Sequence, residues 1–244
     1  MDNITEYFYT NDEIESLYRS VPFKYKSDYT LDELIDRTKI LNNLEFNMNG
    51  DKSIAVVGNS GTLMDKEYGE LIDSHDFVIR CNHGKVEGYE KSVGSKTDFR
   101  FISGKGFWYG KVMDETYSGY DHDFLTNLEN QRMIIKAIPM YNSIQGIIKH
   151  YNTKSNIHFL RESFVKLTED VSSVSNSTLG FSAICLAAQW SSKVSLFGFG
   201  FFKEPWDKQH YFEKIKSYAR DHTFEDEERY INFLETEKLV KIYR

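Results

Sequence analysis

The stretch SIAVVGNSG, residues 53–61, decides the predicted fold class. Its first half, Ser53 to Val57, is a short apolar and β-branched run that predicts a buried strand. In the turn that follows, Gly58 and Gly61 bracket Asn59 and Ser60, so backbone N–H groups can come close to an anionic ligand. Loops at the carboxyl ends of sheet strands are where open α/β proteins bind nucleotides. The stretch therefore indicates an α/β domain with a nucleotide site, although a plain strand-to-helix turn has the same composition.

Two better-known nucleotide motifs are absent from this turn. The dinucleotide fingerprint needs glycine at its first, third and sixth positions, but Gly58 is followed by Ser60 and Leu63 at the other two. The phosphate loop of nucleoside triphosphatases needs a Gly-Lys-Ser/Thr sequence that does not follow Gly61. Both of these nucleotide-binding classes are excluded.

Length and composition bound the class of protein. The chain has 244 residues, enough for one sizeable core, and its net charge of -7 with a pI near 5.6 argues against a nucleic-acid partner. No apolar stretch of about 18 residues occurs, and the acidic N-terminus does not resemble a secretory signal. We therefore expect a cytoplasmic protein without a transmembrane segment. Cys81 and Cys185 form no Cys-x-x-Cys pair, so we expect two buried thiols rather than a metal site or disulfide.

The rest of the chain alternates strand and helix patterns. We expect a helical N-terminal segment, residues 1–50, in which Thr10 with Glu13 and Thr30 with Glu33 have the form of capping boxes. A single domain, residues 51–244, follows. Its later strands are expected at 77–81, 99–103, 133–138, 157–160 and 194–197, with helices at 68–72, at 143–150 and after Gly180. This order predicts an α/β fold with a mostly parallel, twisted sheet flanked by helices.

Candidate binding residues follow several of these strands. Asn82 lies just beyond a strand, as Asn59 does, and the two amides would converge if the strands are parallel neighbours. Ser177 and Thr178 precede a helix, where they either bind an anion or simply cap the helix. The aromatic residues within 104–130 either face a sugar or pack under a long loop.

The C-terminal part contains the candidate acid–base groups. His210 and His222 lie in polar surroundings, and Thr223 is a plausible N-cap for the helix that follows His222. On that helix Glu227 shares a face with Ile231 and Leu234, which predicts a buried carboxylate that needs a partner.

Together these segments resemble the eukaryotic-type sialyltransferases of glycosyltransferase family 29. Residues 53–103 resemble the long sialylmotif, and residues 177–200 resemble the short one. The sequence HYFE at 210–213 resembles the third motif, and His222 followed by Glu227 resembles the very short His-x4-Glu motif. The four motifs occur in the family's order.

The resemblance implies a Rossmann-like domain, a variant of the GT-A fold, and inverting transfer of a sialyl group from CMP-sialic acid to a hydroxyl of an acceptor glycan. The resemblance also implies that no cofactor and no metal is needed. His222 would be the general base, His210 would face the leaving phosphate, and Glu227 would support the site. The residues expected to contact the donor are Asn59, Ser60, Asn82, Thr178, Gly180, Gly198, Phe199, Gly200 and Tyr211.

The chain also departs from the family pattern. Secretory members join the two large motifs by a disulfide, whereas serines stand here at 53 and at 191–192, which fits a reducing compartment and a bacterial or viral relative. In the short motif Leu179 replaces a hydroxyl residue. The donor could therefore be another CMP-ulosonate such as CMP-Kdo, and a CMP-sugar hydrolase or a non-catalytic CMP- or glycan-binding protein remains an alternative. The acceptor, the linkage, the oligomeric state and any peripheral membrane contact stay open.

Overall fold

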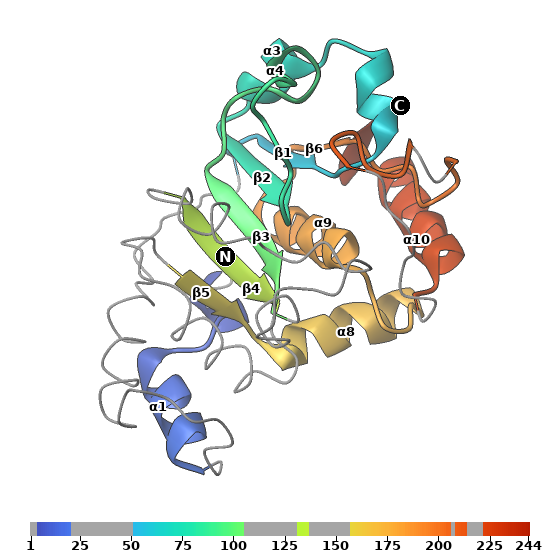
Figure 1. The fold of residues 1–244 in the computed structure, drawn as a ribbon. Coiled ribbons are helices and arrows are strands. Elements are labelled where there is room, and N and C mark those ends of the chain that lie inside the picture. The colour runs from blue at the N-terminus through green and yellow to red at the C-terminus, as the bar shows by residue number, and fades with distance from the viewer. Residues whose placement is uncertain (1–3, 21–50, 105–130, 137–156, 206–207, 214–221) are drawn as a thin grey trace.

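The computed structural model of the chain describes residues 4–20, 51–104, 131–136, 157–205, 208–213 and 222–244. Seven strands in these residues form one sheet in the order β5-β4-β3-β2-β1-β6-β7, and every neighbouring pair is parallel (Figure 1). The strands are β1 (Ile54–Val57), β2 (Phe77–Cys81), β3 (Phe99–Ser103), β4 (Arg132–Lys136), β5 (Ile157–Leu160), β6 (Val194–Phe197) and β7 (Val240–Tyr243).

Helices cover both faces of this sheet. Those described are η1 (Ile4–Tyr7), α1 (Asn11–Ser20), η2 (Gly61–Asp65), α3 (Gly69–Asp73), α4 (Glu90–Val93), α8 (Glu162–Ser172), α9 (Leu179–Trp190) and α10 (Phe224–Thr236). Alternate residues of β1 enter two different cores: Ile54 and Val56 pack with α8, α9 and α10, whereas Ala55 and Val57 pack with η2, α3 and α4. A strand buried on both faces explains the unbroken apolar run of β1.

The order of the strands reverses between β1 and β6. From β1 the chain moves outward through β2, β3, β4 and β5, then returns through α9 to place β6 and β7 on the other side of β1. Helix α9 crosses β1, β2, β3 and β6 (Figure 1). In an open parallel sheet the crevice beyond the carboxyl ends of two such strands is where ligands bind. The fold thus brings the loops at Gly58 and Gly198 together.

The expected α/β class and parallel sheet are confirmed. Four strands have the expected bounds, β1 begins one residue later and β4 one residue earlier than expected, and α9 already includes Gly180. The sequence did not predict α8, β7 or the short helices η2 and α4. Several predictions lie outside the described residues: the 30–33 capping box, the helix at 143–150 and the aromatic residues of 105–130.

The N-terminal helix packs at the β5 edge of the sheet. The predicted capping box is present, since the Thr10 N–H donates to Glu13 at 2.8 Å and the Glu13 N–H donates to the Thr10 hydroxyl at 3.3 Å. The Glu13 carboxylate also accepts two hydrogen bonds from the Arg161 guanidinium, at 2.6 and 2.7 Å. Residue Phe8 forms an antiparallel bridge with Leu160 at the end of β5. These contacts fix α1 relative to the sheet.

The serines at 53 and 191 hold the β1 region by hydrogen bonds. The Ser53 hydroxyl donates to Asp76 at 2.9 Å, and the Ser191 hydroxyl donates to the Lys52 carbonyl at 2.5 Å. Both cysteines are free and buried, as predicted, and burial raises the pKa of each thiol to about 12. Among the described residues no helix is both long and apolar enough to span a bilayer.

Candidate active site

The loops after β1 and β6 lie against each other. Val57 and Phe197 are register partners, the Gly58 N–H donates to the Phe197 carbonyl at 2.8 Å, and the Ser60 N–H donates to the Gly198 carbonyl at 3.1 Å. A Cβ atom on Gly58 would collide with the Gly198 carbonyl oxygen. The glycines therefore permit a close approach of two backbones at the point where the strand order reverses.

The second loop is itself constrained. Gly198 has φ +71°, and a Cβ atom there would lie 2.5 Å from Cδ1 of Leu63. A Cβ atom on Gly200 would lie 2.7 Å from the Ser60 hydroxyl, which is the N-cap of η2. The glycines at 198 and 200 are thus needed for packing within the protein. Any role in accepting a cytosine would be additional.

The two asparagines follow neighbouring strands, as predicted, but hold different partners. The Asn59 side chain donates to the Cys81 carbonyl at 3.2 Å, and its Oδ1 is buried without a hydrogen-bond partner in the described part of the chain. Asn82 has φ +49°, and its Oδ1 accepts a hydrogen bond from the Ser103 N–H at 3.2 Å. Asn59 therefore joins β1 to β2, and Asn82 joins β2 to β3. An unsatisfied buried acceptor such as Asn59 Oδ1 calls for a donor from a ligand or water.

Residues 208–213 lie over these loops. The Tyr211 N–H donates to the Asn59 carbonyl at 3.0 Å, and the Tyr211 hydroxyl donates to the Lys85 carbonyl at 2.5 Å. Burial raises the pKa of Tyr211 to about 12, so its phenol remains a hydrogen-bond donor at neutral pH. His210 bonds through Nδ1 to the Glu213 carboxylate at 2.7 Å, and its ring stacks on Phe212. This segment ties the loop after β1 to the loop after β2.

Thr178 is the partner of Glu227, the buried carboxylate that the sequence predicted to need one. Thr178 is the N-cap of α9, and its hydroxyl accepts from the Phe181 N–H at 3.1 Å. The Glu227 carboxylate, 3 % exposed, accepts the Thr178 N–H at 2.5 Å and the Thr178 hydroxyl at 2.7 Å. The supporting role of Glu227 stays a prediction, and these hydrogen bonds are the contact through which it would act. The Thr178 hydroxyl is engaged with Glu227 and the α9 backbone, so these contacts favour the capping role that the sequence left as an alternative.

His222 lies just before α10, in the loop where the sequence placed it. Its Nδ1 lies 2.5 Å from the Asn176 carbonyl oxygen, and its ring is 5.8 Å from that of Phe224. A carbonyl can only accept, so Nδ1 carries the proton and the neutral ring has its lone pair on Nε2. Asn176 itself was not predicted; its φ of +49° is one that asparagine tolerates better than most residues.

One side chain links the two groups of residues. The Phe199 ring contacts both Gly58, at the end of β1, and Gly180, in the first turn of α9: a Cβ atom there would lie 3.3 and 3.0 Å from the ring. The glycine at 180 thus makes room for Phe199. On one side lie the donor candidates of the β1, β2 and β6 loops and Tyr211, and on the other lie Thr178, Glu227 and the His222 loop.

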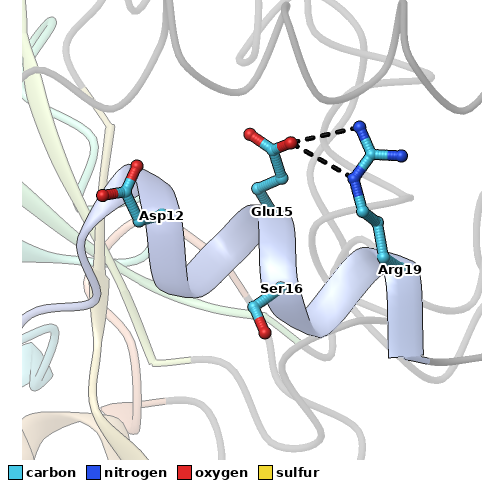
Figure 2. Close-up of a pocket in the computed structure, with 4 residues that line it drawn as sticks. All are labelled: Asp12, Glu15, Ser16 and Arg19. Atoms are coloured by element: carbon cyan, nitrogen blue, oxygen red, sulfur yellow. Dashed lines mark hydrogen bonds and ion pairs between the residues drawn. The ribbon is translucent and has the colours of Figure 1, made fainter.

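Elsewhere, a shallow hollow of about 640 Å³ lies along α1, lined by Asp12, Glu15, Ser16 and Arg19 (Figure 2). Arg19 forms an ion pair with Glu15 at 3.1 Å. Because α1 packs at β5, which three strands separate from β1, this hollow is no part of the predicted donor site. Within the described ranges no three His, Cys, Asp or Glu side chains gather in a metal-binding arrangement.

The family model of glycosyltransferase family 29 (sialyltransferase) matches residues 5–239. The chain belongs to glycosyltransferase family 29. It is 34% identical over 206 residues to a beta-1,6-galactosyltransferase of Arabidopsis thaliana, covering 75% of this chain and 50% of that protein. It is 38% identical over 97 residues to a pig (Sus scrofa) CMP-N-acetylneuraminate-beta-galactosamide-alpha-2,3-sialyltransferase 1, covering 40% of this chain and 24% of that protein.

Solved structures agree with this membership at the level of the fold. The crystal structure of a mammalian sialyltransferase matches with a TM-score of 0.65 at 21% identity, covering 96% of this chain and 84% of that one. A second mammalian structure, in complex with Gal-beta-1-3GalNAc-ortho-nitrophenol, matches with a TM-score of 0.62. The chain spans only about half of the length of the Arabidopsis relative and about a quarter of the length of the pig relative.

Proposed function

We propose that this chain is an inverting, metal-independent sialyltransferase that moves a sialyl group from CMP-sialic acid to a hydroxyl group of an acceptor glycan. Family membership supports the reaction class, and the contact between His222 and the Asn176 carbonyl supports the choice of base. With the proton on Nδ1, Nε2 carries the lone pair that a general base needs. This orientation of His222 is the observation that carries the proposed mechanism.

The proposed reaction is a single displacement. The acceptor oxygen attacks the anomeric carbon of the sialyl group while the bond from that carbon to the phosphate oxygen breaks. His222 Nε2 takes the acceptor proton, and the CMP phosphate leaves with the bonding electron pair. Tyr211, His210 and the backbone N–H groups near Asn59 are the proposed partners of the departing phosphate. His210 is held by Glu213 within the same segment.

A second donor has specific support. The Arabidopsis relative that matches 75% of this chain is named a galactosyltransferase, which favours UDP-galactose as the alternative donor. Both donors carry a nucleotide phosphate that must leave, so the proposed roles of His222 and of the phosphate partners would be the same. The difference would lie in the contacts to the base and to the transferred sugar.

The test is a nucleotide-release assay with CMP-Neu5Ac, CMP-Kdo and UDP-galactose as donors. Each donor is measured with EDTA and a panel of galactose-terminated and sialylated acceptors. We expect acceptor-dependent CMP release from CMP-Neu5Ac that persists in EDTA. Nucleotide release from UDP-galactose or CMP-Kdo alone would identify that compound as the donor in place of CMP-Neu5Ac. Loss of activity in EDTA would overturn metal independence. Donor cleavage without any acceptor would point to a hydrolase, and nucleotide binding without turnover to a binding protein.

The base is tested by His222→Ala. We expect the turnover number to fall by about 10²- to 10⁴-fold, with CMP binding retained. The matched control is Thr223→Ala, which changes the residue next to His222. It removes a hydroxyl that accepts from the Ser175 N–H and donates to the Ser175 carbonyl. A hydroxyl cannot act as a base at neutral pH. Near-normal turnover in His222→Ala would show that His222 is not the general base.

A further inference from the structure

Two arginines lie side by side in the middle of the sheet. Arg80, in β2, and Arg100, in β3, are register partners, so their side chains leave the same face of the sheet. The two residues are 0 % and 4 % exposed. Buried charged side chains are uncommon, and two adjacent charges of the same sign repel each other. Neither residue was assigned a role from the sequence.

Several N–H groups of these two guanidinium groups donate hydrogen bonds to uncharged oxygens. Arg80 donates through Nε to the Thr97 hydroxyl at 2.9 Å and through Nη2 to the Lys96 carbonyl at 2.8 Å. Its Nη1 is buried and has no hydrogen-bond partner among the residues that the structure describes. Arg100 donates through Nε to the Gln131 side chain at 2.9 Å and through Nη1 to the carbonyls of residues 82 and 83, at 3.0 and 2.6 Å.

The nearby carboxylates do not bind Arg80 directly. Asp73 and Asp98 act on its charge at longer range, but Asp73 accepts hydrogen bonds from Ser95 and Lys96, and Asp98 accepts from the Val78 N–H. Burial lowers the pKa of Arg80 to about 10, which still leaves it protonated at neutral pH. A buried cation held this way costs folding free energy that an apolar side chain of similar shape would not.

Both charges lie beneath the candidate donor loops. Arg100 holds three successive carbonyls of the loop after β2, at 82–84, and Tyr211 interacts electrostatically with both guanidinium groups. Tyr211 in turn bonds to Asn59 and Lys85. The two arginines therefore underlie the place where the loops after β1 and β2 meet the segment of the predicted phosphate partners.

We infer that Arg80 and Arg100 are positioning residues whose fixed positive charge selects the phosphate of the nucleotide donor. This inference rests on the proposed function, because it assumes that the donor phosphate lies over these loops. The charges act through the loops and need not touch the ligand. In a protein interior of low dielectric constant, such preorganised charge attracts an anion more strongly than charge in water does, and it needs no rearrangement.

A purely structural role makes a different prediction. If the arginines only hold the loops in shape, their loss weakens binding of the whole nucleotide, base and phosphate alike. If their charge acts on the phosphate, their loss weakens binding of CMP while binding of cytidine, which has no phosphate, is unchanged. The ratio of the two dissociation constants separates these roles when a variant that loses the charge is compared with one that keeps the charge but not the guanidinium hydrogen bonds.

The experiment measures the dissociation constants of CMP and cytidine by calorimetry for the full chain. Arg80→Met removes the charge and keeps much of the shape, Arg80→Lys keeps the charge, and circular dichroism checks the fold of each. Arg161→Met is the matched control, since it removes one positive charge at β5, where Arg161 pairs with Glu13. We expect the preference for CMP over cytidine to fall by about tenfold in Arg80→Met. It should stay within about threefold of wild type in Arg80→Lys and Arg161→Met.

An unchanged preference in a folded Arg80→Met variant would overturn the inference. Should that variant not fold, the same ratio measured for Arg100→Met decides, with the same tenfold fall expected. If the wild type prefers UDP to CMP, the donor proposal fails, and the comparison of UDP with uridine tests the arginines in the same way. If the wild type bound no nucleotide, the proposed function and this inference would both be wrong.

Discussion

The carboxylate of Glu227 in α10 accepts both the N–H and the hydroxyl of Thr178, the N-cap of α9, at 2.5 and 2.7 Å. The contact joins the start of the helix that crosses the sheet to the helix that follows His222. Two neighbouring contacts act in parallel with it: His222 bonds to Asn176, and Thr223 bonds to Ser175. The position of the proposed base therefore depends on how firmly residues 175–178 are held.

Replacing Thr178 by valine should destabilise the fold. The change removes the side-chain cap of α9, worth about 1 kcal/mol, and leaves a buried Glu227 oxygen without its donor, worth about 1–3 kcal/mol. Thr178→Ser keeps the hydroxyl and is the control. Urea unfolding should show a loss of about 2–3 kcal/mol for valine and less than half of that for serine. Equal losses would mean that the hydroxyl contributes nothing.

The stability contributed at Glu227 should depend on pH. Burial raises the pKa of this carboxyl above its usual 4.5, against the opposing effect of the Thr178 hydrogen bonds and Lys136. A group whose pKa is raised by folding contributes its full stability below the unfolded pKa and loses it as the pH rises through the folded pKa. Wild type should therefore lose stability relative to Glu227→Gln as the pH rises from about 4.5.

The measurement is urea unfolding of wild type and Glu227→Gln from pH 4 to pH 8. The two proteins differ at residue 227 alone, so the contributions that the rest of the chain makes to the pH dependence largely cancel in the difference. The free energy of unfolding of wild type minus that of the variant should fall as the pH rises. A difference that does not change over this range would contradict the raised pKa.

The sequence predicted the elements that its local pattern determines. Runs such as Ile54–Val57 and Phe77–Ile79 are apolar on both faces because helices cover both faces of the sheet, so these strands could be recognised from the sequence. The inward position of Glu227 followed from its spacing to Ile231 and Leu234. By contrast, β7 (Val240–Tyr243) is a short edge strand that directly follows a helix, and its alternating Val-Lys-Ile-Tyr pattern is too brief to mark it.

The sequence named candidate site residues but not the contacts that these residues make. Asn176 acts through a backbone carbonyl, which no side-chain pattern reveals. The pairing of Arg80 with Arg100 depends on strand register, and the sequence separates these residues by 20 positions. Neither contact could be predicted from the sequence, because each depends on which strands or loops become neighbours. Tertiary packing determines that.

Two of the positive-φ glycines, Gly198 and Gly88, can be compared as a control pair. Gly198→Ala should destabilise the protein by about 2–4 kcal/mol, because alanine is strained at φ +71° and its Cβ would lie 2.5 Å from the Leu63 side chain. Gly88→Ala carries the strain of φ +84° alone, since a Cβ atom there would meet nothing within 4 Å beyond its own chain neighbours. It should cost about 1 kcal/mol. Thermal unfolding of both variants gives, as the difference between their stability losses, the cost of the contact with Leu63. Equal losses would show that the Leu63 side chain moves aside without cost.

Tyr211→Phe should weaken nucleotide binding more than it weakens the fold. It removes the hydrogen bond to the Lys85 carbonyl but keeps the ring that packs edge-on against Tyr89 at 5.0 Å. A lost hydrogen bond of this kind costs about 1 kcal/mol, and because it loosens the loop after β2, we expect CMP affinity to fall by about five- to tenfold. Tyr68→Phe is the matched control, since the Tyr68 hydroxyl likewise donates to a backbone carbonyl, that of Arg244, at 2.8 Å.

Both tyrosine variants should lose similar stability in thermal unfolding, and only Tyr211→Phe should bind CMP more weakly by calorimetry. Because the pKa of Tyr211 is raised to about 12, the wild-type hydrogen bond should persist up to about pH 10, and the difference in affinity between wild type and Tyr211→Phe should be the same at pH 7 and pH 9. A difference that vanished by pH 9 would mean that the phenol had ionised and that its burial against the donor loops is weaker than this geometry requires.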